Sequence, residues 1–135
     1  MKISNTPDFV GVEWESFVTT RLWTLPAGDG TKTVYVLFRD IVGNETTQAL
    51  SDDIILDTAI PASPSVTIQE GAYTSNPQIH LNLYVSGATY MKIGDDPNFV
   101  GVQAIPYAPT MTVTLSGGDG DKTIYVKYID DAENE

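Results

Sequence analysis

Hydrophobic and polar residues alternate along short segments of this chain, and Gly, Pro, Asn and Asp separate these segments. Residues 78–85 alternate strictly, which places Ile79, Leu81, Leu83 and Val85 on one face of an extended strand. No helical period extends far. The same reasoning predicts further strands over residues 51–57, 65–69, 89–93, 100–107, 110–115 and 122–128. The pattern therefore predicts an all-β protein, and strands at this spacing favour an antiparallel β-sandwich.

The chain repeats itself. Residues 1–45 align without a gap with residues 91–135, at an offset of ninety, and 21 of the 45 aligned positions are identical. The matches include a Met-Lys-Ile start, a Gly-Asp-Gly turn and a Lys-Thr-x-Tyr-Val strand. Self-similarity at a fixed period indicates an array of like structural units. A period of this length suits a β-sandwich domain of about 100 residues better than a solenoid repeat.

The order of the predicted strands places a domain boundary after Asp57. The Pro-rich stretch that follows predicts a linker, because Pro61 and Pro64 do not fit inside a central strand. With the strands of a sandwich lettered A to G, residues 58–135 hold strands A to F and lack G. Residues 1–57 hold strands C, C′, E, F and G and lack A and B.

The alignment also changes the interpretation of the first residue. Because Met1 matches the internal Met91, we expect Met1 to be a repeat position and the sequence to be a window on a longer polypeptide. The alternative is that neighbouring chains donate the missing strands.

Charge and composition exclude several classes of partner and binding site. Lys and Arg number 7 against 18 Asp and Glu, a net charge of −11, which argues against nucleic-acid binding. This charge fits either cations as partners or a surface kept soluble by self-repulsion. There is no cysteine, which excludes disulfides and thiolate metal sites. No apolar run is long enough for a membrane span and no signal-peptide pattern opens the sequence, so an export signal would lie outside it.

No catalytic constellation emerges, and we expect no enzyme. His80 is the single histidine and lies on the polar face of its predicted strand. The Gly-Asp-Gly turns at 28–30 and 118–120 precede no helix, which argues against a phosphate-binding loop. We expect Trp23 to face the core from strand E, and Trp14 to be exposed because it aligns with Ala104.

The stretch GDGTKTVYVLFRDIVGN, followed by SDDIILDTAIP, resembles the bacterial Ig-like repeats of large surface proteins and adhesins. The resemblance implies tandem immunoglobulin-like antiparallel β-sandwich repeats of about ninety residues. It implies an extracellular or cell-surface location, with a phage particle as the alternative. The second copy departs from the pattern at Glu133, which aligns with Gly43 and tolerates positive φ poorly.

The resemblance also suggests calcium at the junction between domains. The predicted ligands are first Asp57, Asp130 and Asn134, then Asp29 and Asp131, while Asp40 and Asn44 would serve a preceding junction. Asp, Asn, carbonyls and water can supply the six to eight oxygen ligands, roughly, that calcium prefers. The alternative stays open: Asp and Asn are also common in turns, where they bond the nearby backbone.

Two functions follow from these observations. The first is a non-catalytic spacer, stalk or fibre-forming segment of a long extracellular protein, whose partners are adjacent repeats or neighbouring copies, head-to-tail. The second is a carbohydrate- or receptor-binding Ig-like module of an adhesin or a phage tail or fibre protein. An exposed aromatic platform or a concave polar groove would favour the second.

Overall fold

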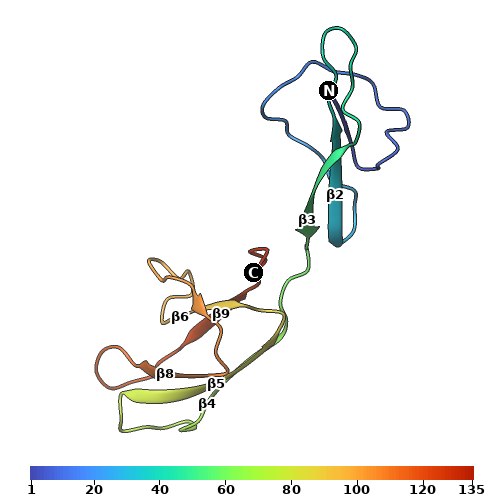
Figure 1. The fold of residues 1–135 in the computed structure, drawn as a ribbon. Helices are drawn as coiled ribbons and strands as arrows, with labels where there is room; N and C mark the ends of the chain where they lie inside the picture. Colours follow the sequence, from blue (N-terminus) through green and yellow to red (C-terminus); the bar gives the residue numbers. More distant parts are fainter. The chain divides into compact units, whose positions relative to one another are not determined.

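The computed structural model describes residues 1–135 and is all-β, with three antiparallel sheets (Figure 1). The chain divides into two compact units, Met1–Thr58 (unit 1) and Ala59–Glu135 (unit 2). The predicted boundary, between residues 57 and 58, lies one residue before this division. No helix is present that could cross a membrane.

Unit 2 consists of two three-stranded sheets. The first has the order β4-β5-β8 and the second the order β7-β6-β9. The bounds of these strands are β4 Ala62–Ile68, β5 Gln78–Ser86, β6 Tyr90–Gly94, β7 Ile105–Pro106, β8 Thr110–Thr114 and β9 Tyr125–Ile129.

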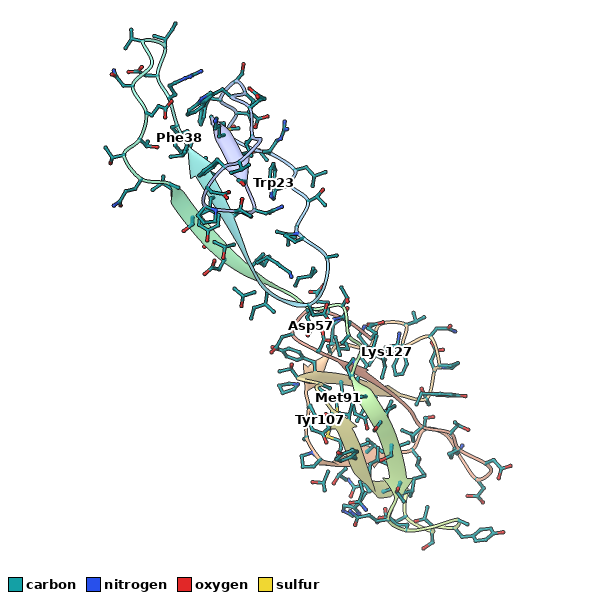
Figure 2. The ribbon with its side chains drawn as sticks, turned by 90° about the vertical axis from the view of Figure 1, so that its right-hand side faces the viewer. Trp23, Phe38, Asp57, Met91, Tyr107 and Lys127 are labelled. Atoms are coloured by element: carbon teal, nitrogen blue, oxygen red, sulfur yellow. The ribbon has the colours of Figure 1, made fainter.

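One hydrophobic core joins these two sheets. The predicted alternation in β5 is confirmed: its four apolar residues are buried and the polar residues between them are exposed. They pack against Met91 of β6, which is fully buried, and Tyr128 of β9. Because both sheets contribute to one cluster, unit 2 is sandwich-like, with β5 supplying the largest share of its core. Figure 2 labels two residues of this packing, Met91 and Tyr107.

Unit 1 is a single sheet with the order β1-β2-β3. Its strands are β1 Lys2–Ser4, β2 Gly30–Leu37 and β3 Leu50–Leu56. Ile3 pairs with Val36, and the aligned residues of unit 2, Ile93 and Val126, pair in the same register. The sequence repeat is therefore also a structural repeat.

Two of the strands predicted for unit 1, C′ and E, are absent, since residues 5–29 contain no strand. The counterpart of strand E in unit 2 is β8, which pairs only with β5. Unit 1 has no strand equivalent to β5, so residues 20–24 lack a ladder partner and stay irregular. Strand C′ is reduced to two hydrogen bonds between the backbones of Met1 and Glu15, at 2.9 and 2.6 Å.

Three predicted limits of strands in unit 2 are also wrong. The strand predicted over residues 100–107 is reduced to β7, Ile105–Pro106. Pro64, assigned to the linker, lies inside β4, which is an edge strand that is irregular between Ala62 and Ser65, where proline is tolerated. The strand predicted to begin at Lys122 begins at Tyr125. In unit 1 the residues aligned with 120–124 pair only with β3, and unit 2 has no counterpart of β3.

Candidate functional site

The predicted ligands Asp130 and Asn134 form the ends of a tight turn. Oδ1 of Asp130 accepts the backbone N–H groups of Ala132 and Asn134, each at 2.9 Å. Oδ2 of Asp130 accepts the side-chain amide of Asn134, also at 2.9 Å. The side-chain amide of Asn134 thus presents an N–H to Asp130, and these contacts are those of a turn held by its own Asp and Asn side chains.

The same turn recurs in unit 1. Asp40 accepts the N–H groups of Val42 and Asn44 at 3.0 and 2.9 Å, and the side-chain amide of Asn44 at 2.8 Å. The backbone position that Gly43 occupies at φ +95° is taken by Glu133 at φ +65° in unit 2. The turn keeps its form despite the glutamate, which therefore carries local backbone strain.

Hydrogen bonding to the charged form lowers the pKa of both turn aspartates. For Asp130 the largest cause is the side-chain bond from Asn134, and for Asp40 it is the bond from Asn44. Each turn is thus most stable when its aspartate is ionised.

The three other predicted calcium ligands, Asp29, Asp57 and Asp131, lie outside these hydrogen-bonded turn ends. Oδ1 of Asp29 accepts the N–H and the hydroxyl of Thr58, at 3.0 and 2.8 Å, so it closes the end of unit 1. Asp57 follows β3 directly, and Asp131 is exposed. Asp29 and Asp57 belong to unit 1, whereas the other three belong to unit 2. No three acidic, His or Cys side chains gather into a metal site within either unit. The bonds of Asp130 fit the turn interpretation, and calcium stays a prediction.

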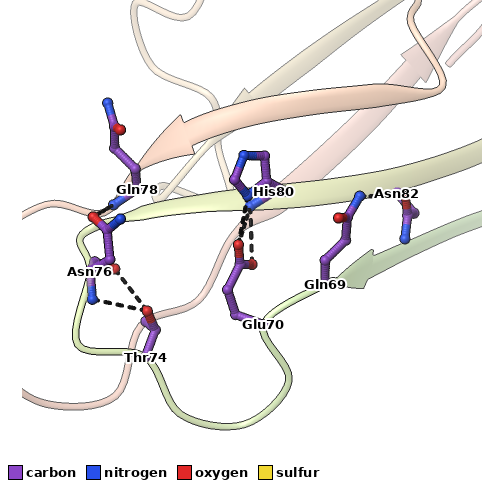
Figure 3. A network of polar contacts seen from close by, with 7 residues as sticks. All are labelled: Gln69, Glu70, Thr74, Asn76, Gln78, His80 and Asn82. Carbon is purple, nitrogen blue, oxygen red and sulfur yellow. Dashed lines mark hydrogen bonds and ion pairs between the residues drawn. The ribbon is translucent and has the colours of Figure 1, made fainter.

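His80 forms a polar pair with Glu70 on the outer face of β5 (Figure 3). Nδ1 of His80 lies 2.7 Å from Oε1 of Glu70. The backbone N–H of His80 donates to both carboxylate oxygens of Glu70, at 3.2 and 3.0 Å. These bonds lower the pKa of Glu70, with the side-chain bond from His80 as the largest cause. The neighbouring Gln69–Asn82 bond joins the same two segments. The network ties the β4–β5 connection to its strand, as expected for a surface histidine.

A cleft of about 770 Å³ lies at one end of unit 2. Residues 71–77, between β4 and β5, line one side, and residues 117–122, between β8 and β9, line the other. Tyr73 is 94% exposed beside it. No sequence motif indicates this cleft, because two loops far apart in the chain form it.

The tryptophans are placed differently from the prediction. Trp14, expected to be exposed, is half-buried under two cations: Arg39 lies 4.3 Å and Lys2 5.2 Å from its ring centre. Trp23 lies outside any strand, and its indole N–H donates to Asn5 at 2.7 Å. Neither ring forms an open stacking platform.

An aromatic pair occurs at matched positions in both units and was also missed. Phe17 and Phe38 meet edge to face at 5.9 Å, and Tyr107 and Tyr128 at 6.0 Å. The hydroxyls of the two tyrosines donate to backbone carbonyls of β5 and β4, at 3.2 and 2.9 Å. The two pairs align with each other at the ninety-residue offset, so the repeat in the sequence contains a signal for this aromatic contact.

Comparison with known proteins gives no relative: no family model matches the sequence, and no curated protein or solved structure is significantly similar to it.

Replacing Asp130 by Ala should lower the urea concentration at which unit 2 unfolds, because three N–H groups of the turn lose their acceptor. Asp131→Ala, which removes the same charge from the next residue, should leave this urea concentration nearly unchanged.

The stabilisation by Asp130 is present above the unfolded pKa of about 3.9 and is lost as the pH falls through the lower folded pKa. The Asp130→Ala protein should therefore lose less stability than the wild type across that window. Equal effects of the two substitutions would contradict this role.

Proposed function

We propose that this chain is a non-catalytic spacer: a segment of a stalk or fibre built from tandem Ig-like β-sandwich repeats. The observation that carries the proposal is the structural repeat. The β1–β2 pair of unit 1 and the β6–β9 pair of unit 2 share their register, and both units have the same Asp-Asn turn. An array of like units extends a chain by a fixed increment per repeat, which is the property a spacer requires.

The strand order of unit 2 supports the Ig-like part of the proposal. Taken in chain order as strands A, B, C, C′, E and F, its strands give one sheet of A, B and E and another of C′, C and F. This division is typical of immunoglobulin-like sandwiches. The hydroxyl of Tyr128, on the F strand, also bonds the backbone of strand A.

The charge supports an exposed setting with repeats as the main partners. A net charge of −11 keeps such a chain soluble through self-repulsion. We therefore propose an extracellular or cell-surface location, or a phage particle, with adjacent repeats or neighbouring copies as head-to-tail partners.

The loop cleft of unit 2 favours a second candidate, a module that binds a carbohydrate or a receptor. Its walls offer the exposed Tyr73 together with polar and charged groups of residues 117–122. The spacer is the stronger proposal because the strand pairing and the Asp-Asn turn that support it recur in both units.

A spacer should be longer than a compact protein of its mass. The radius of gyration of a single compact domain of this length is about 14 Å, and two units placed end to end give roughly 19 Å. Small-angle X-ray scattering of the dilute monomer should give the larger value. The value should be insensitive to salt, because its origin is tandem folded units rather than charge repulsion. A radius near that of one compact domain would contradict the spacer.

The predicted junctional calcium has its own test. Calcium should raise the melting temperature by several degrees above that measured in chelator, since a ligand that binds only the folded state stabilises it. Asp57→Ala should abolish this rise. Asp53→Ala, which removes an exposed carboxylate of β3, should keep it. A melting temperature unaffected by calcium, or a rise retained in Asp57→Ala, would exclude this site.

A further inference from the structure

β8 forms one edge of its sheet. It pairs with β5 alone, and the strands before and after it in the chain, β7 and β9, both belong to the other sheet. The free side of β8 therefore follows from the way residues 62–129 divide between the two sheets. An edge of this kind presents a row of backbone N–H and C=O groups that can pair with another strand.

The backbone groups on the free side of β8 belong to its threonines. The N–H of Leu115 faces β5, because it donates to the carbonyl of Pro77 at 2.8 Å. Backbone groups point to alternate sides at successive residues of a strand, so those of Thr110, Thr112 and Thr114 point away from β5. All three threonines are exposed, and no hydrogen bond within the protein reaches these groups.

Two other strand edges of unit 2 have features that discourage pairing, whereas β8 has none of them. β4 contains Pro64 and is irregular between Ala62 and Ser65, and β7 has only 2 residues and ends in Pro106. Short strands, prolines, bulges and charges are the devices by which proteins prevent edge-to-edge pairing. β8 keeps a regular register and contains neither a proline nor a charged residue. Its edge is therefore open to pairing.

We propose that β8 pairs with β8 of a second copy of this chain, antiparallel, about a two-fold axis that passes beside Thr112. The sheets β4-β5-β8 of the two copies would join into one continuous sheet. Such an interface is isologous, because the same surface of both copies forms it. This side-by-side contact goes beyond the proposed spacer, whose neighbours are head-to-tail.

The sequence of β8, Thr-Met-Thr-Val-Thr, is nearly a palindrome and suits this pairing. When Thr112 lies opposite its symmetry mate, Thr110 lies opposite Thr114, so every cross-strand pair on the exposed face joins two threonines. On the inner face Met111 lies opposite Val113, and both are only half-buried in a single copy. Thr–Thr pairs across antiparallel strands are stabilising, and covering the two apolar side chains removes further surface from water.

The distribution of charge also favours this edge for self-association. Two chains that each carry a net charge of −11 repel one another. No Asp, Glu, Lys or Arg lies within residues 97–118, β4 or β5, so the joined sheets bring no charges together. The rest of the two chains still repel, and salt screens this repulsion. The dimer should therefore become stronger as the salt concentration rises, whereas a contact made by ion pairs would become weaker.

Sedimentation equilibrium of the full chain, at rising protein and salt concentrations, should show a reversible monomer–dimer equilibrium. A contact made by one short strand is weak, so the measurement extends to about 1 mM protein. Amide hydrogen exchange, followed by NMR, should slow at Thr112 as the dimer forms. Exchange at Met111 and Val113, which already face β5, should change little. This alternation is the signature of a ladder along the free side of β8.

A matched pair of substitutions tests the position of the interface. Thr112→Lys places like charges opposite each other across the two-fold axis and should weaken the dimer at least about tenfold. Thr67→Lys adds the same charge to an exposed threonine of β4 on the same face of the sheet, and should leave the dimer nearly unchanged. Because both threonines are exposed, both variants should unfold at nearly the urea concentration of the wild type.

A chain that stays monomeric at about 1 mM in high salt would overturn the proposal. So would a dimer that the two lysine substitutions weaken equally, because the contact would then lie elsewhere. A dimer that slows exchange at residues 120–124 and not at Thr112 would indicate pairing along β9 and would overturn it too. If Thr112→Lys fails to fold, the exchange pattern of the wild type still decides. None of these results changes the radius of gyration of the dilute monomer, which tests the spacer separately.

Discussion

The structure depends on backbone hydrogen bonding between neighbouring strands. Residues 30–34 and 120–124 have three of their five residues in common, yet the first segment is a strand and the second is not. Residues 110–114 form β8, whereas the aligned residues 20–24 are irregular. In both cases the segment is a strand only in the unit that supplies its ladder partner, β3 in unit 1 and β5 in unit 2. An extended segment leaves half of its backbone groups without partners unless a neighbour is present.

The inward side chains of the two units differ in the same way as their strand pairing does. In unit 2 the inward positions Met111 and Ile105 pack against the core that β5 fills. In unit 1 the aligned residues are Arg21 and Glu15, which form an ion pair at 3.0 Å. The rest of its inner face stays partly open, since Phe17 is 65% and Leu50 61% exposed. The two copies therefore share a strand pair and a turn, but only one of them builds a closed core.

Most of unit 2 could be predicted from the sequence, because the strict alternation around Leu81 reports burial and strand character directly. The absence of strands C′ and E from unit 1 could not be predicted. Alternation indicates which residues suit a strand, but it does not indicate whether a neighbouring strand is present to pair with them. The position of Pro64 depends on β4 being an edge, which is a property of the sheet. For the site, the Asp130–Asn134 turn follows from local chemistry, whereas the cleft beside Tyr73 depends on two loops brought together by the fold.

Amide hydrogen exchange along the free chain tests this account most directly. If ladder partners decide which segments are strands, amides at residues 30–34 should exchange more slowly than those at 120–124, and those at 110–114 more slowly than those at 20–24. The aligned segments would then differ in protection in opposite directions between the two units, although their sequences are related. Equal protection of residues 30–34 and 120–124 in the monomer would contradict the account, because the local sequence alone would then determine the strand.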